Sequence, residues 1–262
     1  MRSRALTFLI VVSHASALST SGGGITMRRI DLTNGKELLV AEPAKDVDAE
    51  DAEVAKILGI DIDTVAAQRT ALDQFDNAVG QKLWPASVAF ARMLTGSLVG
   101  TVQGCRVIEV GAGLGLVGVA AALAGAESVT LTDYQPKSLE LAKVTAEANG
   151  VSDIVKTQLL DWTDPGDLKS LGAFDVVLGS DVLYDKELSQ VLVTDVIAPL
   201  LLSHPRDRSR PEPRAMLVDP PNRPSRGVLP EACASCGLYW GGELPVAEAE
   251  DRDTVAINIL RG

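Results

Sequence analysis

The sequence predicts an α/β protein built on a doubly wound, mostly parallel sheet. Short apolar runs alternate with helical patterns from Val107 to Leu260. Several runs are almost continuously apolar, as strands of a parallel sheet are when helices cover both of their faces. A cluster of glycines follows the first run, and an aspartate ends the second. Regular alternation of strand and helix signals is typical of consecutive βαβ units, which place their strands in one open sheet.

Before this alternating region, the sequence predicts a hairpin and several helices. Apolar and polar residues alternate on both sides of Asn34-Gly35, a dipeptide that is typical of tight hairpin turns. Residues 46–80 are acidic, rich in alanine and helical in period, so we expect one or two surface helices there. Pro85 and Gly96 bracket a further short helix, with proline at its start and glycine at its end.

The alternating region itself divides into strands and helices of ordinary length. Asn149-Gly150 marks a helix end, because glycine readily takes the left-handed conformation that closes helices. A polar, proline-rich loop is expected at 203–214. The strands are expected at 107–110, 128–132, 154–159, 174–181, 215–221 and 254–260, and the helices at 113–124, 136–148, 186–202 and 227–238.

Composition and charge argue against several classes of partner and site. The net charge of −11 disfavours a nucleic-acid partner, which needs clustered Lys and Arg. No apolar run is long enough for a transmembrane helix, so we expect no membrane partner. Cys105, Cys233 and Cys236 form no disulfide framework. No second cysteine pair or histidine cluster accompanies Cys233 and Cys236, so we expect no metal site.

The first 26 residues are predicted to be a targeting presequence. A basic start, "MRSR", precedes the apolar core "ALTFLIVV", and small residues follow at Ala15 and Ala17. The next segment is rich in Ser and Gly and has no acidic residue before Asp31. Together the two parts resemble the plastid presequences of algae with complex plastids, with Leu18 where Phe is usual. The alternative is translation from Met27, which predicts a cytoplasmic protein.

The glycine cluster is the first candidate ligand site. Gly111, Gly113 and Gly115 lie where the chain leaves the first strand of the alternating region. Glycine permits positive φ there and lets the backbone approach a ligand closely. Asp133 ends the next strand, where a carboxylate can accept both hydroxyls of a ribose. Gly113, Gly115 and Gly118 also spell GxGxxG, the dinucleotide fingerprint, so a nicotinamide-dependent oxidoreductase is one interpretation.

The register of the glycines argues against the dinucleotide interpretation. In a dinucleotide fold the first glycine follows the strand directly, and here that residue is Gly111, which gives the pattern G-A-G-L-G. An acidic residue, Glu109, also lies just inside the end of the strand. The stretch "VIEVGAGLGLVG" (107–118) resembles the first motif of the class I methyltransferases, which bind S-adenosylmethionine.

Four further segments, in this order and spacing, resemble methyltransferase family 16, the seven-β-strand group that contains many protein-lysine methyltransferases. They are "LWPAS" (83–87), "TDY" (132–134), "LLDW" (159–162) and "GSDVLYD" (179–185). The resemblance runs from about Leu83 to Leu200, and "VDPPNRP" (218–224) is similar to a turn after the fifth strand in some members. It implies a Rossmann-like sheet of seven strands. The chain then divides into a presequence (1–26), an N-terminal extension of hairpin and helices (27–82) and a methyltransferase domain (83–262).

The resemblance also implies the residues of the site. Asp181 and Tyr184 would form the catalytic pair that lines the channel for the substrate amine. Asp133 would accept the ribose hydroxyls of the cofactor, Trp162 would border its adenine, and Trp84 would close it from the N-terminal side. The full set of implied cofactor-binding residues is Trp84, Glu109, Gly111, Ala112, Gly113, Gly115, Asp133, Tyr134, Asp161, Trp162 and Ser180.

Several of these residues have a structural alternative. Tryptophans usually pack in cores or on surfaces, and Tyr134 could pack in the same way. Asp133, Asp161 and Asp181 could cap the helices that follow them. Asp219 ends the fifth strand, where it could face the same crevice or serve the structure.

The expected function is methyl transfer from S-adenosylmethionine to a lysine side chain of a protein. Three other functions stay open: methylation of a small-molecule amine, nicotinamide-dependent oxidoreduction, and cofactor binding without catalysis. We expect a monomer whose partner is a protein that presents a lysine. Its expected location is the plastid, or the cytoplasm if translation begins at Met27.

Overall fold

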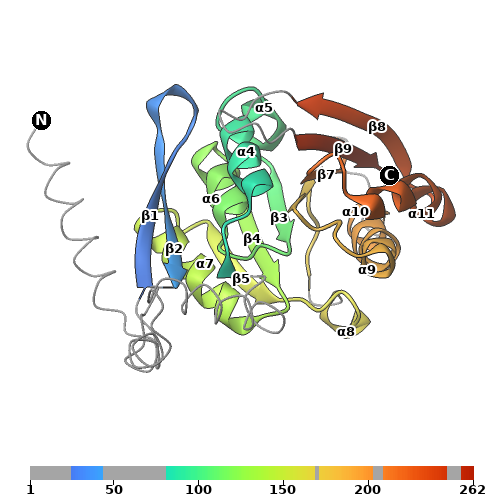
Figure 1. Cartoon of the computed structure of the whole chain (residues 1–262), viewed down its shortest axis with the longest axis horizontal. Helices are drawn as coiled ribbons and strands as arrows, with labels where there is room; N and C mark the ends of the chain where they lie inside the picture. The colour runs from blue at the N-terminus through green and yellow to red at the C-terminus, as the bar shows by residue number, and fades with distance from the viewer. Residues whose placement is uncertain (1–24, 44–80, 169–170, 203–208, 247–254) are drawn as a thin grey trace, which may run out of the picture.

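The centre of the molecule is one seven-stranded sheet in the order β5-β4-β3-β6-β7-β9-β8 (Figure 1). The first five strands of this order are parallel, while β9 runs antiparallel to both β7 and β8. The expected mostly parallel sheet of seven strands is therefore confirmed. The computed structural model describes residues 25–43, 81–168, 171–202, 209–246 and 255–262.

The strand order reverses at the centre of the sheet. The chain lays down β3, β4 and β5 outward in one direction, then returns to place β6 and β7 on the other side of β3. Such a switch point leaves a crevice at the carboxyl ends of the central strands, where ligands bind in open α/β sheets. The strands are β3 (Arg106–Val110), β4 (Ser128–Asp133), β5 (Val155–Leu159), β6 (Val176–Ser180), β7 (Arg214–Asp219), β8 (Tyr239–Val246) and β9 (Val255–Arg261).

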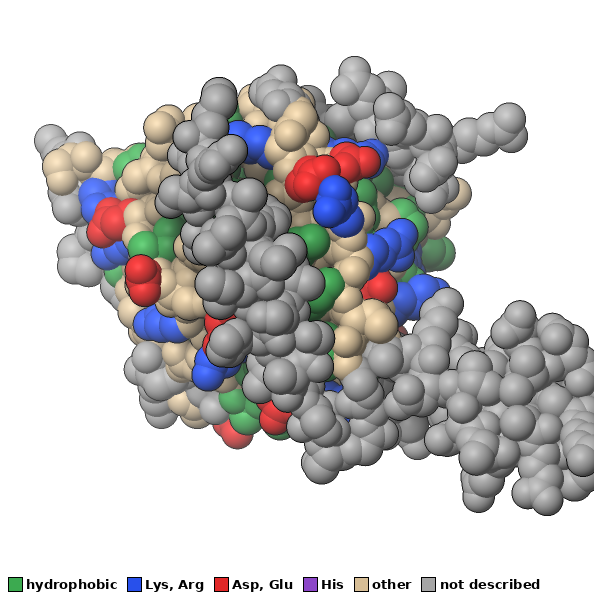
Figure 2. Space-filling view, turned by 90° about the vertical axis from the view of Figure 1, so that its left-hand side faces the viewer, with side chains coloured by type: hydrophobic (Ala, Val, Ile, Leu, Met, Phe, Trp, Pro, Cys, Tyr) green, Lys and Arg blue, Asp and Glu red, His purple; other side chains and the backbone are tan. Residues whose placement is uncertain are grey.

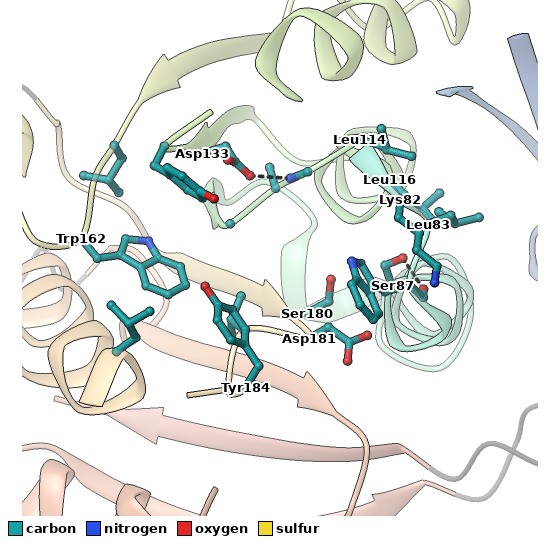
Figure 3. Close-up of a pocket in the computed structure, with 18 of the residues that line it drawn as sticks. Lys82, Leu83, Ser87, Leu114, Leu116, Asp133, Trp162, Ser180, Asp181 and Tyr184 are labelled. Atoms are coloured by element: carbon teal, nitrogen blue, oxygen red, sulfur yellow. Dashed lines mark hydrogen bonds between the residues drawn. The ribbon is translucent and has the colours of Figure 1, made fainter. Parts of the chain in front are cut away.

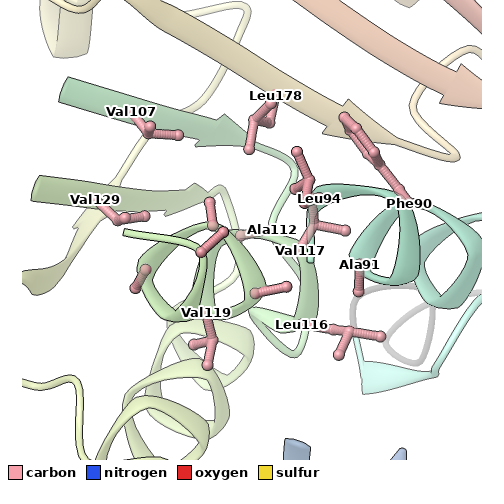
Figure 4. Close-up of a cluster of buried hydrophobic side chains, with 14 of the residues drawn as sticks. Phe90, Ala91, Leu94, Val107, Ala112, Leu116, Val117, Val119, Val129 and Leu178 are labelled. Carbon is pink, nitrogen blue, oxygen red and sulfur yellow. The ribbon is translucent and has the colours of Figure 1, made fainter. Parts of the chain in front are cut away.

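Helices cover both faces of the sheet, and each face has its own hydrophobic core. The first core joins the sheet to α4, α6 and α7, and Figure 4 shows Phe90 and Leu94 of α4 beside Val117 of α6 and Leu178 of β6. The second core joins the opposite face to the segment from α9 to α10 and to α11. The helices are α4 (Pro85–Leu94), α5 (Val99–Val102), α6 (Leu116–Leu123), α7 (Pro136–Ala148), α8 (Pro165–Leu168), α9 (Lys186–Val191), α10 (Ala198–Leu202) and α11 (Leu229–Cys236).

Three elements differ from the sequence expectation. The helix expected at 113–124 begins only at Leu116, because the glycines before it all have positive φ. The helix expected at 186–202 is interrupted by a π-helical stretch at Leu192–Ile197. β8 was not expected at all. Its register shifts between Trp240 and Glu243, across a glycine pair, so the strand lacks the regular alternation by which the other antiparallel strand was found.

The predicted N-terminal hairpin is present and packs beside α7. β1 (Ile25–Asp31) pairs antiparallel with β2 (Glu37–Pro43) across a short 3-10 turn. The Asn149 side chain at the end of α7 accepts from the backbone N–H of Leu39 and donates to its carbonyl oxygen, at 3.0 and 2.6 Å. These bonds occupy one edge of β2 and fix the hairpin on the domain.

The hairpin carries charges of both signs. Arg28 pairs with Glu42 at 3.5 Å, and Arg29 pairs with Glu37 at 3.2 Å. Figure 2 shows the side of the molecule that lies at the left in Figure 1, and acidic and basic side chains lie next to one another on it. β1 begins at Ile25, so the last two residues assigned to the presequence belong to a strand. The rest of the presequence and the helices expected at 46–80 lie outside the described residues. Plastid targeting stays a prediction.

Glu109 has a structural place beneath the glycine loop. Its side chain is buried, and Oε2 accepts a hydrogen bond of 2.7 Å from the backbone N–H of Gly118 in α6. Any Cβ at Gly118 would lie 2.8 Å from this oxygen and 2.2 Å from Leu131, so the close approach requires glycine. Burial raises the pKa of Glu109 to about 8. Glu109 therefore bonds β3 to the start of α6, and its implied cofactor contact stays a prediction.

This buried carboxyl makes stability depend on pH. In the unfolded chain a glutamate has a pKa of about 4.3. Below that pH the side chain is neutral in both states, and it makes its full contribution to the stability of the fold. Its contribution is lost as the pH rises through the folded value of about 8. Glu109→Gln is neutral at every pH. We therefore expect its free energy of unfolding in urea to increase relative to that of the wild type as the pH rises from 5 to 8. Glu140→Gln, on the exposed face of α7, is the matched control. A difference that does not change with pH would contradict this assignment.

Candidate functional site

A cavity of about 310 Å³ opens at the carboxyl ends of the central strands (Figure 3). This volume lies in the range of small-molecule sites, about 300–1,000 Å³. Its wall comes from the segment before α4, the loop after β3, the end of β4, the loop after β5 and the loop after β6. The lining residues are Lys82, Leu83, Trp84, Ser87, Gly111, Ala112, Gly113, Leu114, Leu116, Asp133, Tyr134, Leu160, Asp161, Trp162, Thr163, Ser180, Asp181, Val182, Tyr184 and Leu188.

The glycine loop forms one wall of the cavity with its backbone. Gly111 and Gly113 have φ of 64° and 51°, which few other residues adopt. A Cβ at Gly111 would lie 3.0 Å from Val182 and 3.3 Å from Trp162, so the chain passes close between them. Gly115 does not line the cavity. A Cβ there would lie 2.9 Å from Ala142 of α7, so this glycine serves helix packing, and its implied cofactor contact stays a prediction.

Asp133 ties the glycine loop to the end of β4. Its Oδ2 accepts from the N–H of Gly113 and its Oδ1 from the N–H of Gln135, each at 2.9 Å. Burial raises the pKa of the carboxyl, and the two backbone N–H groups oppose that shift. Asp133 does not cap the following helix, because the cap residue of α7 is Gln135. Each carboxylate oxygen can accept a further hydrogen bond, so the group could hold two hydroxyls.

Aromatic side chains border the cavity. Trp162 lies at one end and Lys82 at the other (Figure 3), and the Lys82 ammonium is 5.1 Å from the centroid of the Trp84 ring. Tyr134 and Tyr184 are the exposed members, at 56% and 45%, which suits positions on the rim. All four aromatic residues named from the sequence therefore lie on the cavity.

Asp161 has a local structural bond as well as a place in the lining. Its Oδ1 accepts from the backbone N–H of Thr163 at 2.9 Å and from the Thr163 hydroxyl at 2.7 Å. This arrangement is an Asx-turn, which shapes the loop after β5. Asp161 is exposed and lines the cavity, so its side chain can still contact a ligand.

Asp181 follows Ser180 at the end of β6 and has an unusual backbone. Its φ of 54° is the single positive value among the described residues other than glycine. Its N–H donates to the carbonyl of Val218 in β7 at 3.0 Å, which secures the bend. Asp181 does not cap a helix. That role belongs to Asp185, whose side chain accepts from the N–H of Leu188 in α9.

The Asp181 carboxylate is nearly enclosed. Its side chain is 3% exposed, and its Oδ1 accepts from Arg223 in an ion pair of 3.0 Å. Its Oδ2 is buried, and the backbone N–H of Ala86 at the start of α4 also acts on this carboxylate. Burial raises the pKa of Asp181, while Arg223 acts in the opposite direction. Burial also raises the pKa of Tyr184.

The sequence reasoning missed some residues of this site. Lys82, Thr163 and Leu188 belong to none of the motifs, and only the three-dimensional arrangement brings them to the cavity. Arg223 lies in "VDPPNRP" (218–224), and this sequence does not reveal its contact with Asp181. Asp219, in the same stretch, is structural: it is fully buried, accepts from the N–H of Leu183 at 2.9 Å and has a pKa raised by burial to about 7.

The lining fits S-adenosylmethionine better than a dinucleotide. A dinucleotide places its pyrophosphate on N–H groups at the start of the helix after the first strand. Here the N–H of Gly118, in the first turn of that helix, is bonded to Glu109. Three carboxyls (Asp133, Asp161 and Asp181) line the cavity beside one ammonium, an excess of acidic groups that suits a sulfonium cation. Among the described residues, no group of His, Cys, Asp or Glu is arranged to hold a metal ion, and no helix could cross a membrane.

Comparison with known proteins points to one family. A family model described as lysine methyltransferase matches residues 67–205, which is more than half of the chain. Protein N-lysine methyltransferase METTL21A of Danio rerio is 37% identical over 135 residues, which cover 50% of this chain and 61% of that protein. Histone-arginine methyltransferase METTL23 of Xenopus laevis is 34% identical over 118 residues, covering 44% of this chain and 50% of that protein. The matched parts thus span about half to three-fifths of these relatives' lengths.

Solved structures share the fold. The 16S rRNA N2 G1207 methyltransferase RsmC of T. thermophilus superposes with a TM-score of 0.53 at 19% identity. The superposition covers 90% of this chain and 50% of that one. At this identity the likeness concerns the fold, which is that of the class I methyltransferases. The family match, the fold and the glycine loop agree, and the chain belongs to methyltransferase family 16, the lysine methyltransferases.

Proposed function

We propose that this protein is an S-adenosylmethionine-dependent N-methyltransferase that methylates a lysine side chain of a protein. The observation that carries the proposal is a single cavity that is lined by the Asp133 carboxylate, by the Asp181 carboxylate and by the backbone of the glycine loop. Family membership supports the class of reaction, and the relatives named as protein methyltransferases support a protein substrate. Because one of these relatives is named for arginine, the methylated residue must be identified directly.

The residues of the cavity divide between binding the cofactor and receiving the amine. When bound, S-adenosylmethionine supplies an electrophilic methyl group on a sulfonium. Asp133 would bind the ribose hydroxyls, and Trp162 would border the adenine. Trp84 and the glycine loop would exclude water on two sides. In such a reaction the protein contributes mainly alignment, since a neutral thioether is a good leaving group.

The amine must lose a proton before it can react. A lysine ammonium has a pKa of about 10.4 in water, and removal from water lowers that value. Asp181 would attract and orient the ammonium at the cavity wall, and Tyr184 would border its channel. Water at the rim can accept the proton, so no side chain of the cavity is required as a general base.

Cofactor binding should depend on Asp133. We expect Asp133→Ala to weaken the binding of S-adenosylhomocysteine by about tenfold to a hundredfold in calorimetry, because hydrogen bonds to a charged group contribute about 1.5–3 kcal/mol. Asp153→Ala, an exposed position beyond α7, is the control for a lost carboxylate. Circular dichroism and thermal unfolding establish that both variants fold. An Asp133→Ala affinity within twofold of the wild type would contradict the ribose assignment.

Methyl transfer should depend on the charge of Asp181. With S-adenosyl-[methyl-³H]methionine in a cell lysate, we expect label in the protein fraction, and methyl-lysine after acid hydrolysis. Asp181→Asn keeps the shape and should lower incorporation at least a hundredfold while leaving S-adenosylhomocysteine affinity within about twofold, since one charged contact of 3 kcal/mol corresponds to roughly that factor. Asp195→Asn, exposed in the π-helical stretch, is the control.

Other outcomes of the labelling experiment would redirect the proposal. Label in the small-molecule fraction would favour a small amine as substrate, and methyl-arginine would favour an arginine side chain. An Asp181→Asn variant that works at the wild-type rate would show that the amine is received elsewhere. A monomeric state, the lack of a nucleic-acid partner and the plastid location stay predictions.

A further inference from the structure

Arg223 reaches the site from a part of the chain that does not line the cavity. It lies in the turn after β7, where Pro220, Pro221 and Pro224 restrict the backbone on both sides. Its own N–H donates to the carbonyl of Pro220 at 3.3 Å, which closes the turn. The guanidinium extends to Asp181 and forms the 3.0 Å ion pair, with side-chain exposures of 28% for Arg223 and 3% for Asp181. The partner of this buried carboxylate is therefore held by a rigid turn.

The two loops that carry this ion pair are bonded to each other at further points. The N–H of Leu183, two residues after Asp181, donates to the Asp219 carboxylate at 2.9 Å. The hydroxyl of Ser225, two residues after Arg223, donates to the carbonyl of Leu183. The position of Arg223 relative to Asp181 is thus fixed by backbone and side-chain bonds on either side of the pair.

An isolated carboxylate at this position would carry its charge at a large cost. Charged groups that are removed from water are stabilised only by a partner of opposite charge or by hydrogen bonds. Arg223 is such a partner, and its guanidinium is charged at every physiological pH. The backbone N–H of Ala86, in the first turn of α4, acts on the Asp181 carboxylate in the same direction as Arg223, and both lower its pKa against the effect of burial.

We propose that Arg223 is a positioning residue for methyl transfer, which keeps the buried Asp181 carboxylate charged and fixed in the cavity wall where the substrate amine arrives. This inference rests on the proposed function and adds to it a residue from outside the cavity. An opposite role can be stated from the same contact: Arg223 could occupy the place of the substrate cation and have to leave before the reaction. The two roles predict opposite effects when the guanidinium is removed. The bonds that hold the Arg223 turn to the loop after β6 favour the first, because they oppose the departure of Arg223 from Asp181.

The charged groups around Asp181 decide how the pair responds to pH. Burial raises the pKa of Asp181 and Arg223 lowers it, so loss of the cation should raise the value further. Asp181 must be ionised to attract an ammonium. The acidic limb of the pH–rate profile should therefore move to higher pH in a variant without the cation. The other charged or titratable groups that face Asp181 or share its cavity are Asp219 and Arg226 from the β7 side, Tyr184 from its own loop, Lys82 from the segment before α4, and Asp133, Tyr134 and Asp161 across the cavity.

The test compares Arg223→Met and Arg223→Lys with the wild type in the full chain. The rate of methyl incorporation from S-adenosyl-[methyl-³H]methionine into lysate protein is measured from pH 6 to 9, and the pKa of Asp181 is followed by carboxyl ¹³C resonance. We expect Arg223→Met to lower the rate at pH 7 at least tenfold, to raise the pKa of Asp181 and to shift the acidic limb upward. Arg223→Lys should restore most of the rate, and S-adenosylhomocysteine affinity should stay within about twofold in both variants.

Arg92→Met is the matched control, because the Arg92 side chain also bonds to one partner within the described ranges, the carbonyl of Asp31, away from the cavity. An Arg223→Met variant with the wild-type rate, pH–rate profile and Asp181 pKa would overturn the inference. An Arg223→Met variant that is faster than the wild type would also overturn it, because Arg223 would then occupy the position of the substrate amine. If Arg223→Met does not fold, Arg223→Gln against Arg223→Lys gives the same contrast. A wild-type protein that fails to bind S-adenosylhomocysteine would instead refute the proposed function.

Discussion

The site depends on one carboxylate that accepts two backbone N–H groups from different parts of the chain. Asp133 binds Gly113 of the loop after β3 and Gln135 before α7. The loop that it holds contains glycines with positive φ. Without this carboxylate, such a glycine-rich loop would be free to adopt many conformations. The same carboxylate also lines the cavity. Asp133 therefore shapes the loop, and we expect it to accept hydrogen bonds from the ribose as well.

Acidic residues at the strand ends recur throughout this architecture, and each is paired differently. Glu109 at β3 binds the start of α6, Asp219 at β7 binds the loop after β6, and Asp181 binds Arg223. Burial raises the pKa of all three carboxyls, so folding opposes their ionisation. Only Asp181 in this set combines an arginine partner with a place on the cavity wall. Two of these carboxyls thus bond the loops that form the crevice, and the third is the one that we propose Arg223 keeps charged for a ligand.

Much of the fold could be predicted because the local patterns and the tertiary structure agree. The central strands are continuous apolar runs, and α7 spans the predicted residues because proline begins it and Asn-Gly follows it. β8 was missed because its glycine pair and bulge remove the pattern by which strands are recognised. The site residues came from motifs that lie at strand ends, and 11 of the 13 singled out line the cavity. Glu109 and Gly115 do not, since the same motif also contains residues that bond or pack the helix behind the loop. Arg223 could not be paired with Asp181 from sequence, because that contact joins loops separated by 42 positions.

The central claim is that the crevice recognises an adenosyl sulfonium and not a dinucleotide. Calorimetric titration of the folded wild-type protein with S-adenosylhomocysteine and, separately, with NADH tests this claim most directly. The account predicts saturable one-to-one binding of S-adenosylhomocysteine and no heat of binding for NADH at millimolar concentration. Binding of NADH together with indifference to S-adenosylhomocysteine would contradict it.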